Sequence, residues 1–201
     1  MRITPALLIA GSTFLWLSQA VCAMPSSPRA FEDNQLLPPA TEKCQLSVST
    51  PFVDYGNKSR WQLQDVEGNN QLLTPGKRQL SYSVVCTFSQ VMRITVQGDS
   101  TTGGNFRYGA NDKLRVTLSN PQLDGNDVQI MTSTPDGVLI DGPFNTLTLQ
   151  AGQSFTLVKG HQPVEGKSFS ARLELEPVLT ERSARVASKQ ISEANFSLQL
   201  R

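Results

Sequence analysis

The chain has 201 residues, of which 38% are hydrophobic, 18 are lysine or arginine and 17 are aspartate or glutamate, so its formal net charge is +1. A charge this close to zero gives no electrostatic attraction to nucleic acid or to an anionic membrane surface, and we expect neither as a partner. The length fits one domain with a substantial hydrophobic core, which needs neither a metal nor several disulfides to fold.

The first 23 residues have the features of a cleavable export signal. Arg2 supplies the positive start, residues 6–17 form an apolar core, and Val21-Cys22-Ala23 provides a small-residue cleavage site. The apolar core is too short to anchor the chain permanently, because a membrane-spanning helix needs about 20 apolar residues. We therefore expect an exported product with no integral membrane span, from which Cys22 has been removed with the signal peptide.

Residues 24–43 form an N-terminal extension that is rich in proline and poor in apolar side chains. Its prolines are Pro25, Pro28, Pro38 and Pro39. This composition predicts an extended segment when it is isolated, because proline fixes the backbone and little apolar surface is available to bury. We therefore place the start of the folded domain, residues 44–201, at the first cysteine after the extension.

The two remaining cysteines, Cys44 and Cys86, each lie on the inward face of a predicted strand. Leu46 and Val48 share the face of Cys44, and Val84 shares the face of Cys86. In the oxidising compartment that export implies, such a pair favours a structural disulfide that joins two strands of one domain, over two buried free thiols. A redox role is disfavoured because the Cys-x-x-Cys spacing is absent.

Alternation of apolar and polar residues, which is typical of half-buried strands, continues through the rest of the chain. The inward residues of the predicted strands are Leu80, Tyr82, Val84 and Cys86; Met92, Ile94 and Val96; Leu114, Val116 and Leu118; Val128 and Ile130; Leu147 and Leu149; Phe155 and Leu157; Phe169, Ala171, Leu173 and Leu175; and Phe196, Leu198 and Leu200. Turns rich in glycine, asparagine, aspartate and proline separate these runs. Many short strands of this kind predict an all-β sandwich.

Only residues 179–193 have any helical period, and their many serine and arginine residues favour a surface loop.

Catalytic and metal-binding patterns are lacking. His161 is the only histidine and lies in a predicted turn, while Asp124 and Asp127 belong to a turn sequence rather than to an acid and base pair. Two cysteines and one histidine are too few for a zinc site, so we predict no enzyme activity, no metal and no cofactor.

These features together resemble a subunit of a bacterial chaperone–usher fimbria. The resemblance rests on a signal peptide, a short extension, a first-strand cysteine and a second-strand cysteine about forty residues later. It also rests on the run Val53-Asp-Tyr-Gly56 after Cys44 and on the closing strand Ala194-Asn-Phe-Ser-Leu-Gln-Leu200. The resemblance covers nearly the whole chain after the signal peptide.

This resemblance implies an immunoglobulin-like, pilin-type sandwich that lacks its last strand and has an apolar groove in its place. Residues lining that partner groove would be Leu46, Val48, Phe196, Leu198 and Leu200. A single residue follows Leu200, so no further strand is expected there. The implied partners are a periplasmic chaperone, an outer-membrane usher and neighbouring fimbrial subunits, and the implied location is a fimbrium on the cell surface, where such subunits contribute to adhesion.

The extension would supply a donor strand to the next subunit, with Phe31, Asp33, Gln35 and Leu37 facing inward. Only the two ends of that register are apolar, whereas a donor strand needs apolar residues at every second position. This departure favours a minor, tip or terminating subunit as much as a shaft subunit. In addition, Leu200 occupies the next-to-last position, where many members of the family have an aromatic residue.

Two alternatives remain open at this stage. In the first, the chain is a self-contained periplasmic β-sandwich whose extension folds back and completes its own sheet. In the second, it is a carbohydrate-binding adhesin with Trp61 and Tyr108 in a shallow sugar site, although a tryptophan in the sequence Ser-Arg-Trp-Gln-Leu is more often a core or edge residue.

Overall fold

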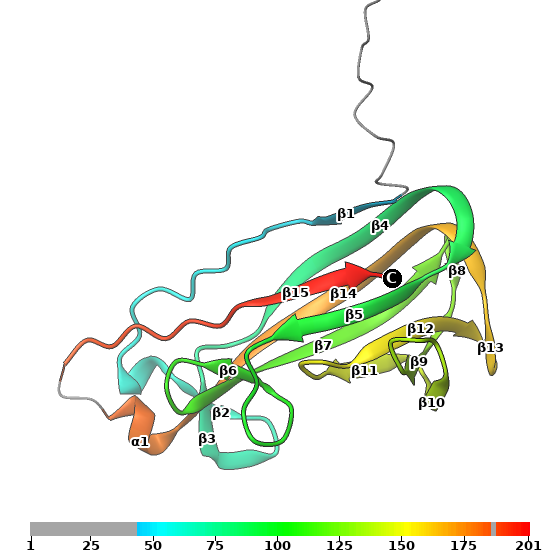
Figure 1. Cartoon of the computed structure of the whole chain (residues 1–201). Coiled ribbons are helices and arrows are strands. Elements are labelled where there is room, and N and C mark those ends of the chain that lie inside the picture. The colour runs from blue at the N-terminus through cyan, green and yellow to red at the C-terminus, as the bar shows by residue number, and fades with distance from the viewer. Residues whose placement is uncertain (1–43, 186–187) are drawn as a thin grey trace, which may run out of the picture. The chain divides into compact units, whose positions relative to one another are not determined.

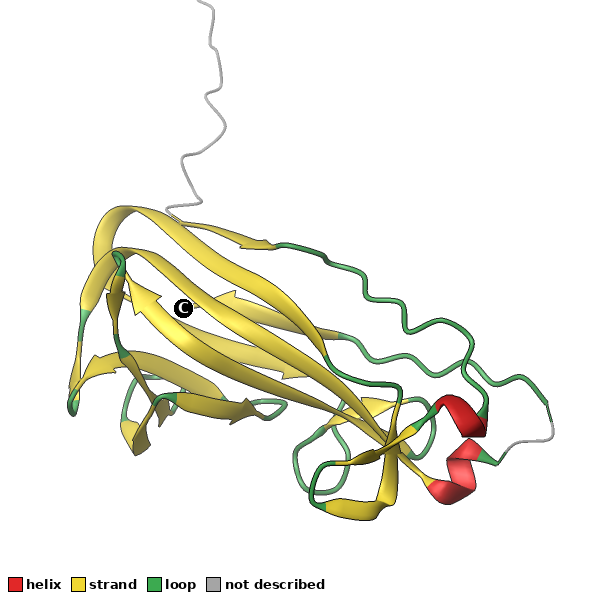
Figure 2. Cartoon of the chain, turned by 180° about the vertical axis from the view of Figure 1, so that it is seen from behind, coloured by secondary structure: helices red, strands yellow, loops and turns green. Residues whose placement is uncertain are grey.

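Two antiparallel β-sheets make up the described part of the chain (Figure 1), which is residues 44–185 and 188–201 of a computed structural model. The expected signal peptide, the extension and all four donor-strand candidates lie outside the described residues. Helical structure is confined to two short segments, the 3-10 turn η1 (Arg60–Gln62) and the helix α1 (Glu181–Ala184), as Figure 2 shows.

The larger sheet is built around β14 (Glu165–Thr180), which pairs with β4 (Arg78–Val91) on one edge and with β7 (Asp112–Leu123) on the other. Its remaining strands are β1 (Cys44–Val48), β2 (Gln64–Val66), β3 (Asn69–Thr74), β6 (Phe106–Tyr108), β8 (Asn126–Asp127) and β11 (Thr146–Leu149). β1 pairs with the outer edge of β4, so β1 is an edge strand of this sheet.

The smaller sheet has the order β10, β9, β12, β5 and β15, with β13 beside β12. Its strands are β5 (Arg93–Gly98), β9 (Gln129–Ser133), β10 (Leu139–Phe144), β12 (Ser154–Lys159), β13 (Gln162–Pro163) and β15 (Phe196–Leu200). Because β15 pairs only with β5 among the described strands, it forms one edge of this sheet.

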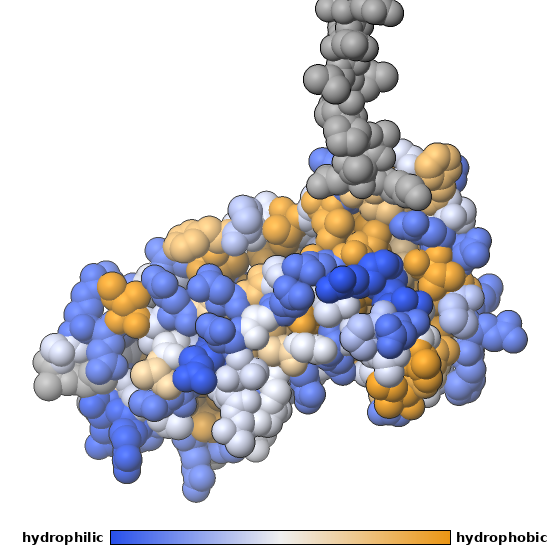
Figure 3. All heavy atoms as spheres, viewed as in Figure 1, coloured by the Kyte–Doolittle hydropathy of each residue, from blue (hydrophilic) through white to orange (hydrophobic). Residues whose placement is uncertain are grey.

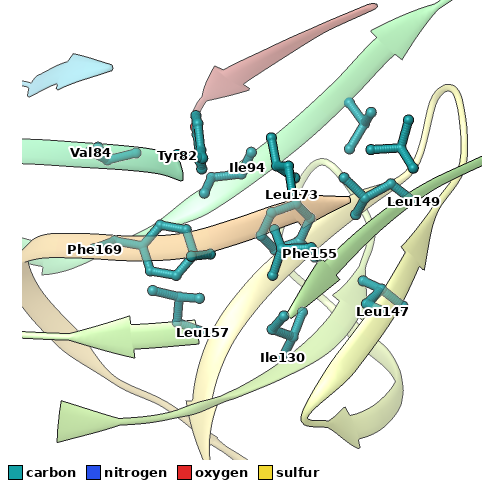
Figure 4. Packing of buried hydrophobic residues seen from close by; sticks show 14 of the residues in the cluster. Tyr82, Val84, Ile94, Ile130, Leu147, Leu149, Phe155, Leu157, Phe169 and Leu173 are labelled. Atoms are coloured by element: carbon teal, nitrogen blue, oxygen red, sulfur yellow. The ribbon is translucent and has the colours of Figure 1, made fainter. Parts of the chain in front are cut away.

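The core lies between the two sheets and consists of the residues that the alternating pattern points inward (Figure 4). Val84 on β4, Ile94 on β5, Leu118 on β7, Phe155 on β12 and Phe169 on β14 are fully buried. The predicted all-β sandwich is thus confirmed, and each predicted run of inward residues lies in or directly beside a strand.

Some elements have no counterpart in the sequence prediction. The edge strand β10 contains a cis peptide bond between Gly142 and Pro143 and has two shifts in its register with β9, so its residues do not alternate regularly. In residues 179–193, where a surface loop was favoured, the structure has the four-residue helix α1, which begins after Thr180. The Thr180 side chain caps this helix by accepting a hydrogen bond from the Ser183 amide.

The predicted disulfide between Cys44 and Cys86 is present. The two residues are direct partners in the pairing of β1 with β4, and they are separated by 42 positions in the sequence. The side-chain amide of Gln90 covers the bridge, with Nε2 3.3 Å from the Cys86 sulfur. The disulfide therefore attaches the first residue of a five-residue edge strand covalently to the sheet.

We expect the double substitution Cys44→Ser and Cys86→Ser to lower the free energy of unfolding by about 3 to 4 kcal/mol, because a loop of this length is no longer closed in the unfolded chain. Urea unfolding of the exported protein measures the loss. As a control, a reductant should destabilise the wild type and leave the double variant unchanged. A loss below about 1 kcal/mol would contradict a stabilising role for the bridge.

Candidate functional site

A gap in the strand pairing separates β1 from β15, which are edge strands of the two different sheets. Figure 1 shows these strands running alongside each other in opposite directions. β1 pairs only with β4 and β15 only with β5, and no backbone hydrogen bond joins β1 to β15 among the residues that the structure describes. Each strand therefore presents one unpaired edge to the gap, and an unpaired edge is a template for another strand.

The inward residues of β1 are incompletely covered. Cys44 and Val48 are half-buried and pack against the core, while Leu46 between them is 36% exposed. In contrast, the inward residues of the neighbouring strand β4 are buried. The inward residues predicted from the alternation are thus buried on β4 and only partly buried on β1.

β15 shows the same incomplete burial on the opposite side of the gap. Its inward residues Phe196, Leu198 and Leu200 are half-buried and pack against the core. Figure 3 shows hydrophobic residues along the gap between the two strands. The five residues that were predicted to line a partner groove thus lie on these two edge strands, and their contact with a partner stays a prediction. We call this region the β1/β15 gap.

Each side of the gap continues beyond its strand. The chain after β1 is extended without strand pairing, and Val53 on it is half-buried against the core. The Tyr55 hydroxyl donates a hydrogen bond of 2.9 Å to the Leu175 carbonyl and thereby holds this stretch to β14. Before β15, Ala194 is half-buried in the same way. Apolar residues that pack against the core thus continue beyond both strands.

The strand β15 is fixed at both ends, by ring packing at one end and by a hydrogen bond at the other. The Phe196 ring packs on that of the fully buried Phe106, with centroids 5.2 Å apart. At the other end, the Arg201 amide donates a hydrogen bond of 2.8 Å to the Arg93 carbonyl. With the disulfide holding β1, each side of the gap is attached to its own sheet.

Tyr82 lies beside the gap on the inner face of β4 and was predicted only as a core residue. It is the direct partner of Val48 in the pairing of β4 with β1, so both side chains point to the same face. Burial raises the pKa of its hydroxyl above the usual range. The alternating pattern showed that Tyr82 faces inward, but it carried no signal for the surroundings of the hydroxyl.

The described residues outside the gap offer little for catalysis. They contain no cluster of three histidine, cysteine, aspartate or glutamate side chains that could hold a metal ion. His161 lies exposed in a turn, as predicted. Asp124 lies in a turn and has a structural role, since one of its carboxylate oxygens accepts hydrogen bonds from the backbone amides of Lys167 and Ser168.

Trp61 and Tyr108 do not form the exposed aromatic pair that the adhesin alternative requires. Trp61 is 91% exposed on η1, so the expectation of a core or edge position was wrong. Tyr108 is half-buried against the core. Arg60, beside Trp61, forms an ion pair with Glu181, and Arg185 binds the same carboxylate. The hydrogen bonds from Arg60 and Arg185 lower the pKa of the Glu181 carboxyl.

No family model and no curated protein matches the sequence. Among solved structures, the chain is similar to the crystal structure of the P pilus rod subunit PapA, with a TM-score of 0.32 and 15% sequence identity over 79% of this chain and 99% of that chain. A similarity this low carries no argument about function. In the described part of the chain, no helix is long and apolar enough to cross a membrane.

Truncation of matched leucines should distinguish the open gap from the closed core. We expect Leu46→Ala to lower the free energy of unfolding by less than about 1 kcal/mol, because this side chain is already partly in water. Leu118→Ala, at a fully buried position, should cost about 2 to 5 kcal/mol. Urea unfolding of both variants measures the difference. Equal losses would show that another segment of the chain covers Leu46.

Proposed function

We propose that this protein is a structural subunit of a chaperone–usher fimbria that is assembled by donor-strand complementation. The observation that carries the proposal is the β1/β15 gap, in which two unpaired strand edges flank half-buried apolar side chains. A strand from another chain inserted there would supply backbone partners to both edges and apolar side chains to the core at once.

The same geometry supports a need for a chaperone. A free subunit exposes unpaired backbone and apolar surface together, and this combination promotes aggregation through edge-to-edge pairing. A periplasmic chaperone would occupy the gap temporarily. An outer-membrane usher and a neighbouring subunit would then exchange the chaperone strand for a permanent one, and the product would be a fimbrium on the cell surface.

Within such a fibre, the sequence is as consistent with a minor or tip position for this subunit as with a shaft position. Its extension has polar residues, Asp33 and Gln35, at the two central positions of the donor register. A contribution to adhesion would place a contact surface away from the gap, and Trp61, exposed on η1, is available for such a contact. A donor segment that folds back on its own chain is the competing arrangement.

Co-expression tests the proposal directly. We expect the exported chain to accumulate in soluble form only when a cognate chaperone is present, as a complex with it, because the open gap otherwise leads to aggregation or proteolysis. Removing residues 24–43 should leave the yield of the chaperone complex unchanged and should abolish transfer of this subunit onto the next one. The readouts are the periplasmic yield of soluble protein and the formation of subunit pairs.

Two outcomes would contradict the proposal. One is an equal yield of stable monomer with and without the chaperone. The other is unfolding of the isolated domain when residues 24–43 are deleted, which is the behaviour expected of a self-contained sandwich whose extension completes its own sheet.

A further inference from the structure

The hydroxyl of Tyr82 has no hydrogen-bond partner among the residues that the structure describes. Tyr82 is only 4% exposed. A buried hydroxyl without a partner is unfavourable, and native proteins rarely retain one without a reason. Tyr55 provides a contrast, since its hydroxyl donates to the Leu175 carbonyl.

Tyr82 lies at the base of the β1/β15 gap, with its hydroxyl buried beneath the surface. Tyr82 lies directly beside Val48 of β1, and Figure 4 shows its ring pointing from β4 toward β15. On its other side the ring meets the Phe169 ring edge to face, with centroids 6.0 Å apart. An entirely apolar base would suit a fully apolar donor strand, whereas the base of this gap contains one buried polar group.

The chain's own extension carries polar residues where such a group needs them. In the register of Phe31, Asp33, Gln35 and Leu37, the two apolar residues would fill the ends of the gap and the two polar residues its middle. Burial of the Asp33 carboxylate is much less favourable than burial of an amide, because a charge loses more hydration. The Gln35 amide can also both donate to and accept from a hydroxyl.

We propose that the Tyr82 hydroxyl is the polar recognition point of the β1/β15 gap and that it binds the side-chain amide of Gln35 in residues 31–37 of a second copy of this chain. The inference rests on the proposed function and specifies the strand that the gap accepts. It selects donor strands with a central amide over fully apolar ones. Gln35, a polar residue that departs from the expected donor pattern, thereby determines which donor strand the gap accepts.

A second copy is the favoured source because of the sequence that joins the donor segment to β1. The six residues 38–43 begin with Pro38 and Pro39 and contain no glycine, asparagine or aspartate. Tight hairpin turns favour those three residue types, and consecutive prolines favour an extended backbone. A return of the segment into the gap beside its own β1 is therefore disfavoured.

Synthetic peptides test the pairing without altering the fold of the protein. A labelled peptide of residues 24–43 and its Gln35→Leu variant are titrated with the full exported chain and with its Tyr82→Phe variant, and binding is followed by fluorescence anisotropy. The readout is the ratio of the two Kd values on the same protein, so competition from that protein's own extension cancels.

On the wild-type protein we expect the Gln35→Leu peptide to bind about 2- to 12-fold more weakly, the range of one neutral hydrogen bond. On Tyr82→Phe the ratio should fall to one or below, because leucine then faces an entirely apolar base. An Asn34→Leu peptide, altered at an outward position, should give the same ratio on both proteins. Tyr82→Phe itself should unfold at the same or a higher urea concentration than the wild type.

Equal Gln35→Leu ratios on the two proteins would overturn the pairing and leave the proposed function intact. Absence of binding by every peptide to either protein would overturn both the second-copy occupant and strand complementation by this segment. A Gln35→Leu peptide that binds the wild type more tightly would show that the gap prefers a fully apolar strand.

Discussion

An unpaired backbone edge beside apolar surface is the constraint on which the account of this protein depends. Every strand in the middle of the two sheets has partners on both sides, and its inward residues are buried. At β1 and β15 both conditions fail together, because each has one partner and half-buried inward residues. Water satisfies the backbone there but leaves the apolar side chains exposed, so a strand from elsewhere can satisfy both requirements.

Other contacts in the molecule attach each side of the gap to its own sheet. The disulfide attaches Cys44 to β4, and Phe196 packs on the buried Phe106 on the other side. Beyond the end of β1, the Tyr55 hydroxyl holds the following stretch of chain to β14 by a hydrogen bond. Because these contacts bind each edge to its own sheet, the two edges do not need each other for stability. The site is thus a product of the whole sandwich.

Most of the fold could be predicted from the sequence, because alternation shows which residues face inward. It identified β4, β7, β14 and β15, and together with the export signal it favoured the disulfide between Cys44 and Cys86. It missed β10, whose register with β9 shifts twice so that its residues do not alternate regularly. Alternation also cannot show whether an inward hydroxyl has a hydrogen-bond partner, or whether an aromatic residue in a short turn is exposed. Those properties of Tyr82 and Trp61 depend on segments far apart in the sequence.

Hydrogen exchange of the β1 and β15 amides tests the central claim most directly. In an antiparallel edge strand, about half of the amides point away from the neighbouring strand. If the gap is open, these amides should exchange rapidly in the free chain while those of β4 and β14 remain protected, and they should become protected in a complex with a complementing strand. Protection of both edges in the isolated chain, equal to that of β4, would contradict the account.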